Sequence, residues 1–102
     1  MAEITSYSHL IEASIPAISW DEAWFALLTW KGYLQSLPGH ESTRISAYPL
    51  ENGDVRLYVT VHWRYPEEME EWRQSEWSAG DFLSNLQTPP YDVLEVVMED
   101  FS

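Results

Sequence analysis

Two histidines on strand-like segments, His9 and His62, are the side chains best suited to acid–base chemistry in this chain. An imidazole gains or loses a proton near neutral pH, so each is a candidate catalytic base. Three of the five basic residues, Arg44, Arg56 and Arg64, belong to the same segment as His62. A guanidinium beside such a base could hold an enolate or a carboxylate, so the pattern favours proton abstraction from a small acidic substrate.

Tyr58, Arg56 and Arg64 are the candidate ligand-binding residues of this segment, because strand alternation puts them on one face with His62. The alternative is a structural role for these residues. His62 would then be a sheet residue whose hydrogen bonds are satisfied, and the arginines would form the ion pairs Arg64–Glu41 and Arg56–Glu51 or Arg56–Asp54. His40 follows a glycine and is expected in an exposed loop.

Composition excludes several functional classes. The net charge is −12, from 17 acidic and 5 basic residues, and such a field repels nucleic acid and anionic membrane surfaces. The chain has no cysteine, hence no disulfide and no thiolate nucleophile, and its histidines match no metal-ligand spacing. We expect a cytoplasmic protein, since no secretory signal and no apolar run of about 20 residues is visible. Serine-hydrolase and phosphate-loop motifs are also missing.

Hydrophobic spacing predicts the order strand, helix, strand, strand, helix, strand. Residues 4–13 and 91–101 are predicted as the first and last strands, and residues 40–65 as a hairpin around Asn52-Gly53. A two-residue turn there would pair Glu51 with Asp54 and set Ala47 opposite Tyr58, Ile45 opposite Thr60 and Thr43 opposite His62. Pro49 cannot donate a ladder hydrogen bond, so its strand is predicted at a sheet edge.

The first helix is predicted to begin at a capping box formed by Ser19 and Glu22 and to end near residues 37–39. Its apolar stripe would consist of Trp20, Trp24, Leu27, Leu28 and Leu34. The second helix is predicted to start at Pro66, with Met69 and Trp72 facing inward. A break is expected at residues 79–81, followed by a short helical piece. The aromatic residues left off these stripes, Phe25, Trp30 and Trp77, are candidates for dimer contacts.

This order is that of an α+β, ferredoxin-like βαββαβ domain spanning residues 1–102, a four-stranded antiparallel sheet with two helices on one face. The strands carry apolar residues on both faces, so a second sheet is the expected cover of the open face. The sequence thus predicts a homodimer through sheet faces, a dimeric α+β barrel.

The segment Tyr58-Val59-Thr60-Val61-His62-Trp63-Arg64-Tyr65-Pro66-Glu67-Glu68-Met69-Glu70-Glu71-Trp72-Arg73-Gln74-Ser75-Glu76 resembles the antibiotic biosynthesis monooxygenase-like (ABM-like) group of dimeric α+β barrels. The resemblance implies that the strand of His9 neighbours that of His62, so the two histidines could converge. It also places Trp63 and Trp72 near the family cavity, where they could stack on a flat substrate, although core packing is the alternative for both. The axial histidine of haem-degrading members falls on Phe82, so haem is not expected to bind. No other cofactor is expected.

What the resemblance implies about activity is a cofactor-independent monooxygenase, or a related enzyme, acting on a small aromatic or polyketide-like molecule. A base, His62 or His9, would deprotonate the substrate, Arg56 or Arg64 would stabilise the anion, and the anion would react with oxygen. The alternative is a non-catalytic dimerisation or small-ligand-binding module.

Overall fold

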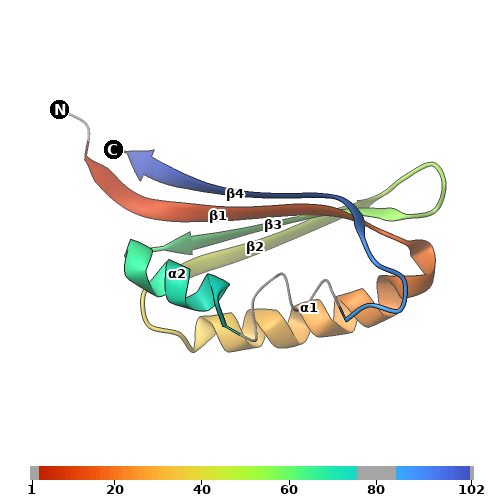
Figure 1. Cartoon of the computed structure of the whole chain (residues 1–102), viewed down its shortest axis with the longest axis horizontal. Helices are drawn as coiled ribbons and strands as arrows, with labels where there is room; N and C mark the ends of the chain where they lie inside the picture. The colour runs from red at the N-terminus through yellow and green to blue at the C-terminus, as the bar shows by residue number, and fades with distance from the viewer. Residues whose placement is uncertain (1–2, 76–84, 102) are drawn as a thin grey trace.

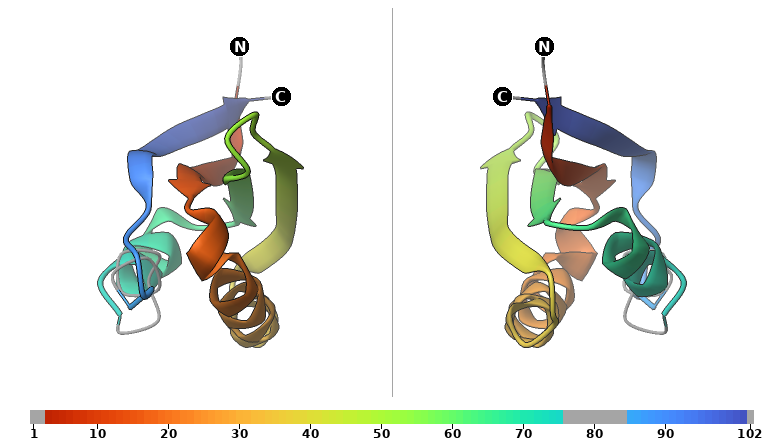
Figure 2. Two further views of the ribbon diagram at one scale, coloured as in Figure 1. Left: turned by 90° about the vertical axis from the view of Figure 1, so that its right-hand side faces the viewer. Right: turned by 90° about the vertical axis from the view of Figure 1, so that its left-hand side faces the viewer.

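The computed structural model describes residues 3–75 and 85–101 and follows the predicted order of elements. They are β1 (Ile4–Ile15), the 3-10 turn η1 (Ala17–Ser19), α1 (Trp20–Gln35), β2 (His40–Pro49), β3 (Val55–Trp63), α2 (Pro66–Arg73) and β4 (Tyr91–Phe101). The strands form one antiparallel sheet of order β2-β3-β1-β4. Both helices lie on one side of the sheet (Figure 1), which curves around them (Figure 2). The predicted ferredoxin-like α+β class is confirmed.

The hydrophobic core lies between the sheet and the helices. Alternate residues of β3 face the helices and are almost fully buried, as predicted for that strand: Leu57, Val59, Val61 and Trp63. The antiparallel ladder sets Ile11, Ala13 and Ile15 of β1 beside them on the same face. Among the described residues, no helix is both long and apolar enough to cross a membrane.

The buried stripe of α1 differs from the predicted one. It runs through residues spaced four, three and four apart, the period of an α-helix: Ala23, Leu27, Trp30 and Leu34. Trp24 and Leu28, assigned to the stripe from sequence, are 44% and 50% exposed. Trp30, expected at a dimer contact, is instead a core residue packed against Trp72, with ring centroids 5.6 Å apart.

The β2–β3 hairpin is closed by three residues rather than two, so the predicted register was wrong by one residue. Leu50 N donates to Asp54 O at 2.7 Å, and Gly53 N donates to Leu50 O at 3.0 Å. Gly53 has φ +91°, a conformation that glycine adopts without a Cβ penalty. The extra residue sets Ile45 opposite Val59 instead of Thr60 and thereby turns it to the helix side.

The helix starts are placed as predicted, but the first is stabilised differently. Ser19 is the N-cap residue of α1 without a side-chain capping bond, so the predicted capping box does not form. Its hydroxyl instead donates to Thr88 O and accepts from Thr88 N, joining the helix start to the segment before β4. Pro66 opens α2 as predicted. The break predicted at residues 79–81 and Trp77 lie outside the described residues.

The face of the sheet turned away from the helices carries a mixture of apolar and polar side chains. Pro49 lies at the end of the edge strand β2, as predicted. Away from that edge, β1 and β4 contribute aliphatic side chains to the same open face, namely Leu10, Leu94, Val96 and Met98. Leu94 and Met98 are 46% and 44% exposed, so no described element covers them.

Candidate functional site

A pocket lies at the junction of α1, α2 and the end of β3, on the helix side of the sheet. Its volume is about 130 Å³, and its lining includes Tyr33, Leu37, Trp63, Glu68, Glu71 and Trp72. An apolar cavity of about 150 Å³ is enough to bind benzene, so the pocket has room for a ligand of about six heavy atoms. It is too small for a fused polycyclic molecule to enter whole.

Three aromatic rings belong to the pocket lining. Trp63 and Trp72 are 0% and 3% exposed, whereas Tyr33 at the rim is 37% exposed. The ring centroid of Trp72 lies 5.6 Å from that of Tyr33 and 6.5 Å from that of Trp63. The indole nitrogens of both tryptophans are buried with no hydrogen-bond partner in the described part of the chain. A buried donor without an acceptor costs about 1–3 kcal/mol, which the fold tolerates at this pocket.

Two carboxylates from α2 contribute to the polar part of the lining. Glu71 is exposed, and Glu68 is half-buried. Gly39, with φ +78°, lies against the Glu68 carboxylate so closely that a Cβ on residue 39 would overlap it. A glycine at position 39 therefore lets the loop between α1 and β2 approach α2 and close that side of the pocket.

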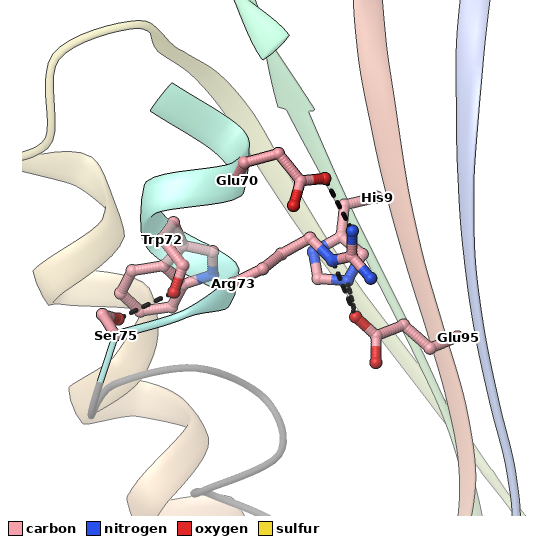
Figure 3. A network of polar contacts seen from close by, with 6 residues as sticks. All are labelled: His9, Glu70, Trp72, Arg73, Ser75 and Glu95. Atoms are coloured by element: carbon pink, nitrogen blue, oxygen red, sulfur yellow. Dashed lines mark hydrogen bonds and ion pairs between the residues drawn. The ribbon is translucent and has the colours of Figure 1, made fainter. Parts of the chain in front are cut away.

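His9 belongs to a separate network on the same side of the sheet, which joins β1, α2 and β4 (Figure 3). Its Nε2 lies 2.7 Å from Glu95 Oε1, and Arg73 Nε donates to the same carboxylate oxygen at 3.1 Å. Arg73 Nη1 also donates to Glu70 at 2.7 Å. The imidazole is 1% exposed, and its Nδ1 has no partner within residues 3–75 and 85–101.

Burial controls the protonation of this network. It lowers the pKa of His9 below 6.5, and the hydrogen bond to Glu95 opposes that shift without cancelling it. For Glu95, burial raises the pKa of the carboxyl, but the hydrogen bonds from His9 and Arg73 outweigh burial and bring it below 4.5. His9 is thus neutral at pH 7, and if Nε2 carries the proton donated to Glu95, Nδ1 is left as a buried acceptor.

His62 lies on the opposite, open face of the sheet. Its Nδ1 is 3.0 Å from Ser8 Oγ and 3.7 Å from Asp100 Oδ2. Ser8 Oγ donates to Asp100 Oδ2 at 2.7 Å, and this bond, with one from Ser6, lowers the pKa of Asp100. The serine proton is directed to the aspartate and not to the histidine, so this cluster does not activate a nucleophile in the manner of a Ser-His-Asp triad.

Arg56 and Tyr58 share that open face with His62, as predicted, but their partners differ from those expected. Arg56 Nη2 donates to Glu12 at 3.0 Å and Nη1 to Ser14 at 2.9 Å, so Arg56 pairs with neither Glu51 nor Asp54. Six residues along one strand separate Arg56 from His62, which corresponds to about 20 Å. The two side chains are too far apart to act on the same atom of a small substrate.

The sheet register therefore separates most of the residues that the sequence suggested as one site. His9 pairs with Val61 on the helix side, whereas His62 pairs with Ser8 on the open face, so the two histidines do not converge. Arg64 lies just beyond β3, is exposed, and donates its backbone N–H to Gly39 O at 2.8 Å. Of the predicted ligand-binding residues, Trp63 and Trp72 lie together in the lining of this pocket.

Sequence reasoning missed the rest of the pocket lining. Tyr33 is three residues from Trp30 and Glu68 is four from Trp72, so helical spacing alone placed each pair on one side of its helix. No local pattern indicates that the end of α1 meets the start of α2. The partners of His9 were missed for the same reason, because Glu95 reaches it across two strands that are distant in sequence. Within the described residues, no group of three or more His, Cys, Asp or Glu could hold a metal ion.

Comparison with known proteins identifies the fold of this chain but not its activity. No family model and no curated protein matches this sequence. A proposed antibiotic biosynthesis monooxygenase from Nitrosomonas europaea has a TM-score of 0.70 at 11% identity, covering 96% of this chain and 92% of that chain. The Rv0793 protein of Mycobacterium tuberculosis has a TM-score of 0.68 at 14% identity, covering 95% and 96%. The fold is therefore the ferredoxin-like fold of ABM-like proteins.

A third similar structure is that of a protein described as dimeric. A dimeric protein of unknown function and ferredoxin-like fold from Bacteroides fragilis has a TM-score of 0.61 at 10% identity, covering 94% of this chain and 97% of that chain. At these identities the likeness is one of fold.

Proposed function

We propose that this chain is an ABM-like domain that binds a small molecule in the pocket of Tyr33, Trp63 and Trp72 and that works as a homodimer. The observation that carries the proposal is the pocket itself, a concave site whose lining combines two buried tryptophans with Tyr33 and two carboxylates. Most ligand sites combine these features, because apolar rings supply binding free energy and a few polar groups orient the ligand.

The homodimer is supported by the open face of the sheet. Leu94 and Met98 are exposed there, and contiguous exposed apolar groups are typical of interaction surfaces. Two charged groups of this face already have partners within the chain, in the Arg56–Glu12 ion pair and the Ser8–Asp100 hydrogen bond. A second copy of the sheet could bury these two groups without leaving them unpaired. The dimeric protein from Bacteroides fragilis with the same fold supports the same assembly.

Cofactor-independent monooxygenation is the second candidate, favoured by the His9–Glu95 pair and by the name of the Nitrosomonas europaea protein. A neutral, buried imidazole with an unpartnered nitrogen is suited to take a proton from a phenol. His9 is absent from the pocket lining, however, so a substrate held by Trp63 and Trp72 does not contact it in this conformation. An oxygen-consumption assay with hydroquinones as substrates tests this candidate. Activity that is abolished in His9→Gln, while the variant remains a folded dimer, would favour the monooxygenase over the binding module.

A titration of fragments of about six heavy atoms, followed by NMR of the ¹⁵N-labelled indole groups, tests the binding proposal. We expect saturable shifts of the Trp63 and Trp72 indole resonances, assigned with Trp63→Phe and Trp72→Phe. Trp24, exposed on the outer side of α1, provides the matched control resonance that should not move. A library that shifts no indole, or that shifts Trp24 alone, would contradict the proposal.

A further inference from the structure

We infer that the ligand of this pocket is a small organic cation of the quaternary or methylated ammonium class. The inference rests on the proposed function and names the class of ligand for the same site. Its central observation is that three aromatic rings and two carboxylates line a single small pocket: Tyr33, Trp63, Trp72, Glu68 and Glu71.

Aromatic faces bind cations through the negative potential above the ring, and tryptophan binds them most strongly. The ring centroid of Trp72 lies 5.6 Å from that of Tyr33 and 6.5 Å from that of Trp63. A cation in the adjoining space could lie within about 6 Å of more than one ring, the range over which the attraction acts. Aromatic cages that recognise quaternary ammonium groups likewise place several rings around one cation.

The charge of the pocket selects the same class of ligand. The lining includes Glu68 and Glu71 but no Lys, Arg or His among the described residues. His40 packs edge-on against Trp63 at 5.8 Å, and burial lowers its pKa, so it adds no positive charge there at neutral pH. The net charge of −12 attracts cations over longer distances. A phenolate or carboxylate would meet two carboxylates and no compensating cation.

The size of the pocket and the chemical groups of its lining narrow the class of ligand further. A volume of about 130 Å³ fits a ligand of about six heavy atoms, which is the size of tetramethylammonium or choline. A divalent metal ion would need several oxygen ligands, and aromatic faces supply none. A methylated ammonium has a dispersed charge and an apolar surface, so it suits a lining that combines aromatic rings with carboxylates.

The test compares four probes at constant ionic strength: choline, tetramethylammonium, benzoate, and 3,3-dimethylbutan-1-ol, the neutral isostere of choline. We expect choline and tetramethylammonium to shift the Trp63 and Trp72 indole resonances saturably, and choline to bind about tenfold or more tightly than the alcohol. Benzoate should leave both resonances unmoved.

Matched variants separate a cation cage from a general apolar site. Tyr33→Leu should weaken choline binding about two- to thirtyfold, whereas Tyr33→Phe keeps the ring and most of the affinity. Glu71→Gln should also weaken choline binding, because it removes a rim charge. Glu67→Gln, an exposed carboxylate on the same helix outside the lining, provides the control and should change nothing.

Each outcome bears on a different claim. If the alcohol or benzoate binds as tightly as choline, or if other fragments bind and the cations do not, the cation inference is overturned and the small-molecule pocket stands. If neither these probes nor the fragments shift Trp63 and Trp72, both the inference and the proposed function are overturned.

Discussion

His9 and Glu95 meet across two antiparallel strands, with 2.7 Å between Nε2 and Oε1, on the face of the sheet that the helices cover. The imidazole is buried, while the Glu95 side chain is 40% exposed and also accepts a hydrogen bond from Arg73. One carboxylate thus satisfies a buried ring nitrogen of β1 and links it to α2.

Removing that carboxylate should destabilise the fold. Glu95→Ala leaves His9 Nε2 buried without an acceptor, which we expect to lower the free energy of unfolding by about 1–3 kcal/mol. Glu95→Gln keeps an oxygen acceptor and should lose clearly less. Urea unfolding of both variants measures the difference, and equal losses would show that the hydrogen bond to His9 is not what Glu95 contributes.

Stability should rise with pH through the range in which His9 titrates. Burial lowers the pKa of His9 below its unfolded value of 6.5, so below pH 6.5 the unfolded chain binds more protons than the folded one. Neutral His9 makes its full contribution to the free energy of unfolding above about pH 6.5. This contribution is lost as the pH falls through the folded-state pKa.

The matching measurement is the slope of unfolding free energy against pH between about pH 5 and 7. One histidine contributes at most about 1.4 kcal/mol per pH unit. His40, whose pKa burial also lowers, contributes with the same sign. His9→Gln should therefore flatten the slope in part, and His9→Gln with His40→Gln should flatten it further. A slope unchanged in His9→Gln would be inconsistent with a buried, neutral His9.

Two glycines should respond to alanine in opposite directions. Gly53 has φ +91° and open space around its Cβ position, so Gly53→Ala adds only backbone strain and should cost about 1–2 kcal/mol. Gly32 lies inside α1 with nothing within 4 Å of a Cβ, so Gly32→Ala should stabilise by about 0.5–1 kcal/mol. Thermal unfolding of the two variants checks both signs. A neutral Gly53→Ala would argue against the three-residue turn.

A charge on the open face should dissociate the proposed dimer. Burying an unpaired carboxylate costs several kcal/mol, so Met98→Glu should weaken self-association about 100-fold or more. Phe25→Glu is the matched control, since Phe25 is 73% exposed on the helix side and was a sequence-based candidate for dimer contacts. Sedimentation equilibrium distinguishes the two. Dissociation by Phe25→Glu alone would place the interface on the helices.

The order of elements could be predicted because each depends on local signals. Pro66 marks a helix start, Asn52-Gly53 marks a hairpin, and the alternation of β3 identifies its buried face. The register could not be predicted, because two- and three-residue loops share the same Asn-Gly signal. The third loop residue shifts the strand pairing by one position, which turns Ile45 to the helix side.

The candidate site was less predictable than the fold. Assigning His9 and His62 to one site needed the relative faces of β1 and β3, which depend on a ladder between segments that are distant in sequence. Trp63 and Trp72 were found because both lie in one local segment. Tyr33 approaches Trp72 only through the packing of α1 beside α2, for which no sequence pattern was visible.

A crystal structure of the protein with the tightest-binding fragment would show both the ligand between Tyr33, Trp63 and Trp72 and the homodimer. We expect ligand density against these rings, and two sheets packed through Leu94 and Met98. Density at another site with an empty pocket would overturn the proposed binding site. Open faces left exposed to solvent would overturn the proposed dimer.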